Sequence, residues 1–264
     1  MNRLFYFALF LTVLFASCKK MGCTDMEAEN YNPDATHDDG SCQYIANDSI
    51  KIKIIPTYNN VDLELDSAYS TDEGYNVKFT TISFFISHLA NNSDTINESS
   101  LYDFRDKGSQ LLSKRADFNL YPSIQGSIGV DSINNHSDPS AFDDENDLNI
   151  ENAGTMHWGW NTGYIFVKIE GKVDTLSSGN FDHNFSFHAG TDVFLKQLTF
   201  ENILWEQTAQ NEHTLNLLLS MSDFLSSDLN TIDLKYEFIT HSNSGQQALT
   251  EKVVINFVNA LSLQ

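Results

Sequence analysis

Polar and apolar residues alternate along most of the chain after residue 48, with the period of two that is typical of strands with one buried face. The clearest examples are residues 50–56, 61–65 and 76–87, which are also rich in β-branched residues. Shorter segments of the same kind predict the remaining strands, at residues 100–104, 121–130, 164–170, 184–188, 192–199, 214–219 and 231–239.

One helix is predicted, near the end of the chain. Over residues 246–261, Leu249, Val253, Phe257 and Leu261 recur every four residues and form one apolar stripe. Many short strands followed by a single helix predict an all-β domain, an antiparallel β-sandwich of the Greek-key-like kind with a C-terminal helix.

The first residues predict export. Arg3 precedes an apolar run over residues 4–16, which is shorter than the roughly 20 residues that a membrane-spanning helix needs. Small residues then lead to Cys18, as in the cleavage box of bacterial lipoproteins. We therefore expect residues 1–17 to be a lipoprotein signal peptide and Cys18 to carry a lipid that anchors the chain in the cell envelope. The alternative is an ordinary signal peptide that happens to end near a cysteine.

Residues 18–47 predict a small stalk module before the main domain at 48–264. An exported chain whose remaining cysteines are Cys23 and Cys42 most simply joins them in a disulfide. The segment resembles a short GCTD…NYNP…DDGSC module of exported bacterial proteins. Its turn-rich loop offers candidate Ca²⁺ ligands, although it lacks the terminal glutamate of an EF-hand loop: Asn32, Asp34, Asp38 and Asp39. The alternative is that these side chains only form Asx turns.

The charge balance and the motifs of the chain argue against several classes of function. With 36 acidic and 15 basic residues the net charge is −21, which argues against binding to nucleic acid or to anionic membrane surfaces. The chain contains no GxSxG nucleophile elbow, no HExxH metal motif and no glycine-rich phosphate loop, so an enzyme is not expected.

The most distinctive stretch runs from residue 156 to residue 171. On a regular strand Met156, Trp158 and Trp160 share one face, and His157 lies on the other. A second segment, residues 185–190, places His188 in a Phe-x-His-x-Gly pattern. Imidazole is the commonest side-chain ligand for copper and zinc, so a metal site is one interpretation. The other is that the aromatic residues are sandwich core and His188 is a structural histidine.

Together these two segments resemble the signature of the MbnP-like copper-binding proteins. The resemblance implies a copper site, for Cu(I) or Cu(II), that includes His188 and the region of Trp158. It also implies oxidation of Trp158 to kynurenine by a di-haem peroxidase partner. In the family a ligand histidine follows two residues after that tryptophan, but Trp160 occupies the position here. The remaining ligands are therefore expected to be His157, or His136 from the acidic loop 131–155, with Trp160 and Met156 beside the metal.

Two functions follow from the sequence. The first is a lipid-anchored protein of the cell envelope that binds copper for storage, acquisition or hand-over. The second is an envelope module without a metal that recognises a partner protein or a glycan through its loops.

Overall fold

The computed structural model describes residues 19–26, 28–43, 48–159, 163–227 and 229–264. The chain divides into two compact units, residues 1–45 and residues 46–264, and each is described by itself. None of the helices in these described ranges is long and apolar enough to cross a membrane. The expected lipidation site Cys18 lies outside the described residues.

The first unit contains the predicted disulfide between Cys23 and Cys42, which is confirmed. In a closed loop of this length such a cross-link stabilises by about 3 kcal/mol. The candidate calcium ligands make local turns: Asn32, Asp38 and Asp39 each accept a hydrogen bond, at 3.0 Å, from the backbone N–H two residues further on. The Asx-turn interpretation accounts for these three side chains.

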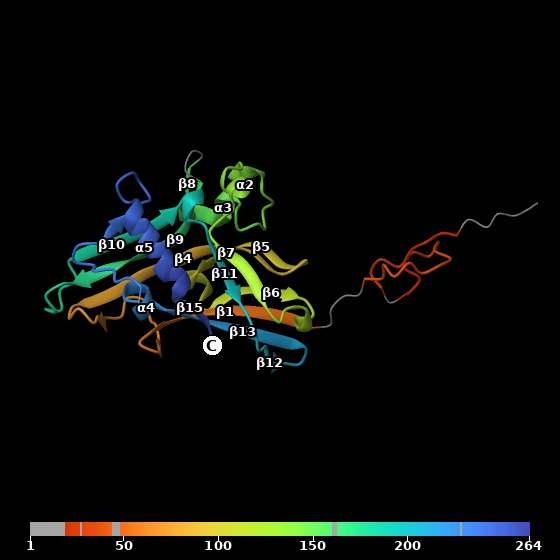
Figure 1. Ribbon diagram of the computed structural model, residues 1–264, viewed down its shortest axis with the longest axis horizontal. Helices are drawn as coiled ribbons and strands as arrows, with labels where there is room; N and C mark the ends of the chain where they lie inside the picture. The colour runs from red at the N-terminus through yellow and green to blue at the C-terminus, as the bar shows by residue number, and fades with distance from the viewer. Residues whose placement is uncertain (1–18, 27, 44–47, 160–162, 228) are drawn as a thin grey trace, which may run out of the picture. The chain divides into compact units, whose positions relative to one another are not determined.

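The second unit is built on two curled sheets (Figure 1). The six-stranded sheet has the order β12-β13-β1-β2, with β6 also on β1 and β15 also on β13. Its strands are β1 (Ser49–Tyr58), β2 (Val61–Asp62), β6 (Gln110–Arg115), β12 (Glu206–Ala209), β13 (Glu212–Ser220) and β15 (Leu261–Leu263). The central pair β1–β13 is parallel, whereas the sequence predicted an antiparallel sandwich.

The nine-stranded sheet has the order β11-β7-β4-β9-β10-β14, with β3 and β5 on β4 and β8 on β9. Its strands are β3 (Tyr69–Ser70), β4 (Asn76–Asn91), β5 (Asp94–Asp103), β7 (Ile124–Ile128), β8 (His157–Gly159), β9 (Gly163–Asp174), β10 (His183–Gly190), β11 (Lys196–Phe200) and β14 (Ile239–Thr240). Of the strand expected over residues 231–239, only Ile239 lies in a strand, β14. Asp233 causes this difference, because its side chain accepts from Lys235 N and its carbonyl from Tyr236 N, which fixes turns.

The main core lies between the two sheets and confirms the sandwich. It joins residues of β1, such as Ile52, to residues of β4 and β10, such as Phe84 and Phe187. The predicted helix is α5 (Gln247–Asn259). Val253 and Phe257 of its stripe are buried, Leu249 is half-buried, and Leu261 lies beyond the helix in β15. Phe257 packs edge-on against Phe84 at 4.9 Å between ring centroids. The short helices are α1 (Phe104–Lys107), η1 (Phe118–Leu120), α2 (Ser132–Asn135), η2 (Pro139–Ala141), α3 (Ile150–Ala153), η3 (Gly154–Met156), η4 (Asp192–Phe194) and α4 (Met221–Leu225).

The acidic segment 131–155 is an ordered cover rather than a solvated loop. It forms α2, η2, α3 and most of η3. Beneath it lies a second apolar cluster, in which Leu148 and Met156 pack with Phe85, Tyr164 and Phe166 of the nine-stranded sheet. The Tyr164 hydroxyl donates to the carbonyl of Leu148. This second core explains why a segment so rich in Asp and Asn holds one shape.

Candidate functional site

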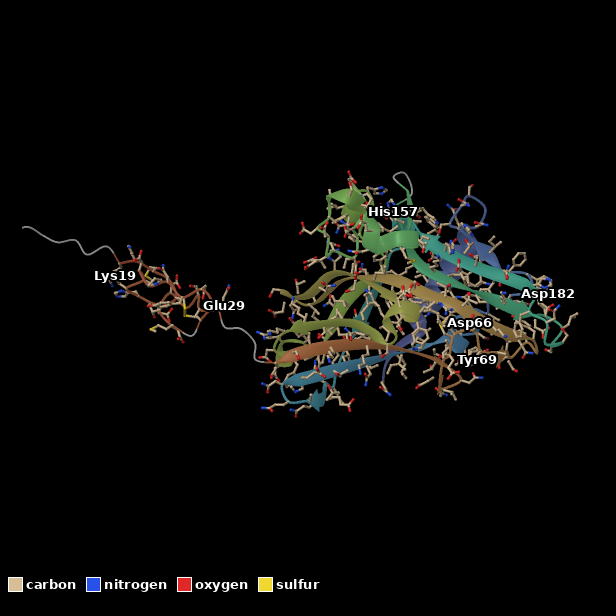
Figure 2. All side chains as sticks on the ribbon, turned by 180° about the vertical axis from the view of Figure 1, so that it is seen from behind. Lys19, Glu29, Asp66, Tyr69, His157 and Asp182 are labelled. Carbon is tan, nitrogen blue, oxygen red and sulfur yellow. A yellow bond between two sulfur atoms is a disulfide. The ribbon has the colours of Figure 1, made fainter. Side chains whose placement is uncertain are left out.

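The tryptophan motif forms a short hairpin at one end of the nine-stranded sheet. Strand β8 pairs with the start of β9, so that His157 lies opposite Tyr164 and Gly159 opposite Gly163. Figure 2 shows His157 and Asp182 at opposite ends of the β9–β10 strand pair. The tip of the hairpin, with Trp160, lies outside the described residues.

His188 and His241 come together at this end of the sheet. The rings are tilted by 39° and their centroids are 4.6 Å apart. The reason is the parallel pairing of β10 with β14, in which Phe187 lies opposite Thr240. The residue that follows each of these two in the chain is a histidine, His188 in β10 and His241 just after β14. Ser242 ties the two segments further, because its hydroxyl donates to the carbonyl of His188 and accepts from Gly190 N.

His188 stands on the face of the sheet away from the main core. Its strand neighbours Phe185 and Phe187 are buried in that core, and the alternation of a strand sends Ser186 and His188 to the other face. Glu170 of β9 lies opposite Ser186 and therefore diagonally next to His188 on this face. Only 13% of the His188 side chain is exposed.

Glu170 holds the His188 ring. Its Oε1 lies 2.8 Å from Nε2 of His188, and its Oε2 accepts a hydrogen bond of 3.0 Å from the Thr81 hydroxyl. The bond to His188 is the main cause that lowers the pKa of Glu170 to about 2, against the opposing effect of burial. Glu170 therefore stays ionised through the physiological range and keeps accepting from the imidazole.

Three ring nitrogens at this site have no hydrogen-bond partner in the described part of the chain. They are Nδ1 of His188 and both ring nitrogens of His241. Burial lowers the pKa of His241, and the neighbouring His188 lowers it further while Glu170 opposes the change. A neutral imidazole carries an unshared lone pair, which is the form that binds a metal.

Trp158 completes the site. Its ring centroid lies 6.5 Å from that of His188, and its six-membered ring packs on Gly190. A Cβ at Gly190 would come within 2.7 Å of Trp158 Cζ3 and of the carbonyl oxygen of Tyr164. The glycine of the Phe-x-His-x-Gly pattern is thus the residue that lets the tryptophan reach the histidine.

The other two expected ligands lie elsewhere. His157 packs edge-on against Tyr164 at 4.8 Å, and burial lowers its pKa. His136 places Nε2 3.1 Å from a carboxylate oxygen of Asp192. Within the described ranges no contact joins either residue to His188. The residues that lie beside His188 are His241 and Glu170, and the spacing in the sequence gave no signal for either.

A buried asparagine holds the hairpin in place. Asn135, which is 2% exposed, accepts from Tyr164 N at 2.8 Å and donates to Asp192 at 2.8 Å. Gly163 lies directly against it, with φ of +70°. The acidic segment 131–155 therefore fixes the start of β9. It thereby also fixes the position of Trp158 relative to β10.

The arrangement does not have the geometry of a serine hydrolase. Ser186 Oγ and Glu170 Oε1 both meet the same nitrogen of His188, Nε2, at 3.2 and 2.8 Å. A catalytic triad needs the hydroxyl and the carboxylate on different ring nitrogens. Within the described part of the chain, no three His, Cys, Asp or Glu side chains are grouped so as to hold a metal ion. The described site therefore offers a pair of imidazoles beside an indole.

The fold and the site together define the class of this protein: a β-sandwich that carries a pair of histidines and a tryptophan hairpin at one end of a sheet. A family model described as MbnP matches residues 47–246, and the chain belongs to the MbnP family. Among solved structures, MbnP from Methylosinus trichosporium matches with a TM-score of 0.46 and 12% identity, covering 68% of this chain and 78% of that one. No curated protein sequence matches the chain significantly.

Proposed function

We propose that this protein binds copper through His188 and His241 and serves the cell envelope as a copper store or carrier. The observation that carries the proposal is the pair of imidazoles, 4.6 Å apart between ring centroids, with open nitrogens and a lowered pKa at His241. Membership of the MbnP family supports a copper-related role.

The residues present fit copper. Imidazole suits copper, and Cu(I) accepts a low number of ligands, so two histidines suffice for a first level of affinity. Glu170 accepts from the other nitrogen of His188 and keeps the ring oriented, as carboxylates do behind metal-binding histidines. Trp158 itself is a poor ligand, because the indole nitrogen has no lone pair in the plane of the ring. Oxidation to kynurenine by a di-haem peroxidase partner would supply an amine as a further donor.

Competition titration tests the proposal. The chain without its signal segment should bind about one equivalent of Cu(I) against a chromophoric chelator. His188→Ala should weaken binding by more than tenfold, which corresponds to about 1.4 kcal/mol or more. His37→Ala, a histidine of the first unit, should leave the affinity unchanged. If His188→Ala binds copper as tightly as the unmodified chain, the copper proposal fails and a metal-free binding module becomes the better interpretation.

The location in the cell is a second part of the proposal: we infer a lipid anchor at Cys18. The apolar run before it and the small residues Ala16 and Ser17 support this. In a bacterial host, the unmodified chain should partition into the detergent phase and Cys18→Ala into the aqueous phase, because the variant cannot receive the lipid. Equal partitioning of both chains would contradict the anchor.

A further inference from the structure

The carboxylate of Glu170 is held on both of its oxygens. Oε2 accepts from the Thr81 hydroxyl at 3.0 Å, and Oε1 faces Nε2 of His188 at 2.8 Å. Thr81 lies opposite Glu170 in the β4–β9 ladder, and Glu170 lies opposite Ser186 in the β9–β10 ladder. Three strands therefore fix the direction in which Glu170 points. With both oxygens engaged, Glu170 is not itself placed as a ligand.

This contact selects one tautomer of His188. An ionised carboxylate only accepts hydrogen bonds, so the nitrogen that faces it must carry the proton. That nitrogen is Nε2, and the Ser186 hydroxyl at 3.2 Å reaches the same atom. A neutral imidazole has one N–H, and its lone pair is consequently on Nδ1. Nδ1 has no hydrogen-bond partner among the described residues.

We propose that Glu170 is a positioning residue that fixes His188 as the Nε2–H tautomer, so that copper binds His188 through Nδ1. The proposal rests on the proposed function. A carboxylate that accepts from the second ring nitrogen of a metal-binding histidine typically contributes tenfold or more to metal affinity.

Nitrogen NMR of the full exported chain with ¹⁵N-labelled histidine tests this directly, because Cu(I) is diamagnetic. Long-range proton–nitrogen correlations should show the Nε2–H tautomer of His188 in the copper-free chain. Addition of one equivalent of Cu(I) should then shift Nδ1 strongly and leave the proton on Nε2. This measurement needs no substitution near the site other than His188→Ala for assignment.

Three variants separate the role of Glu170 from mere packing. Glu170→Ala should give a mixture of tautomers and weaken Cu(I) binding by about tenfold. Ser186→Ala removes only the longer contact to the same nitrogen and should preserve both the tautomer and the affinity. Glu212→Ala, which removes a carboxylate of the six-stranded sheet paired with Lys51, is the remote control and should change neither.

The outcomes distinguish this inference from the copper proposal. An Nδ1–H tautomer in the copper-free chain, or a copper-induced shift at Nε2, would overturn the role of Glu170 while leaving copper binding intact. If the tautomer is as expected but neither nitrogen responds to Cu(I), the proposed function is overturned instead.

Discussion

A chain in which His188 and His241 are both replaced by alanine should retain no copper in competition with a Cu(I) chelator. The two rings supply the open nitrogens that the structure brings together, at 4.6 Å between centroids. Removing both leaves Trp158, whose unmodified indole is a poor ligand, and Glu170, whose Oε2 stays bonded to Thr81. Each single variant should lose more than tenfold in affinity, or about 1.4 kcal/mol or more.

His157→Ala and His136→Ala are the matched controls. His157 packs on Tyr164 and His136 on Asp192, and neither contacts His188 within the described residues. Both variants should therefore bind copper as the unmodified chain does. Loss of binding in either one, with His241→Ala unaffected, would restore the ligand set expected from the sequence and reject His241.

Replacing Gly163 by alanine should cause a large loss of stability. Its φ of +70° is costly for any residue with a side chain, and the added Cβ would lie 2.2 Å from Asn135 Oδ1 and 2.6 Å from the backbone oxygen of Asn135. Asn135 is buried and bonded on both sides, so it cannot move away cheaply. Backbone strain and overpacking together should lower the free energy of unfolding by about 3 kcal/mol or more.

Gly179→Ala isolates the backbone part of this effect. Gly179 also has a positive φ, +87°, but no atom lies within 4 Å of the position that a Cβ would take. Its substitution should cost only the strain of the left-handed conformation, about 1–2 kcal/mol. Urea unfolding of the two variants under the same conditions measures the difference. Equal losses in the free energy of unfolding would show that the contact with Asn135 does not contribute to the effect.

The alternation of polar and apolar residues predicted the sandwich well because burial on one face imposes it strand by strand. Residues 50–56 and 76–87 fall within β1 and β4, and the stripe from Leu249 to Phe257 lies on α5. A period of two contains no information on which strand lies beside which. The parallel pairing of β1 with β13 therefore could not be read from either segment alone.

The same limit explains what was missed at the site. His188 and Trp158 could be singled out because each stands in a local motif. His241 stands in no motif, and the segment before it is governed by the turn around Asp233 rather than by alternation. It reaches His188 only through the pairing of β10 with β14, which joins residues more than fifty positions apart. Glu170 likewise depends on the register between β9 and β10.

Copper K-edge X-ray absorption of the Cu(I)-loaded chain is the most direct test of the histidine pair. The unmodified protein should show the multiple-scattering pattern of two imidazoles bound to one copper, and His241→Ala loaded at the same ratio should show one. Identical spectra for the two chains, or a copper without imidazole ligands, would contradict the assignment of His188 and His241 as the copper site.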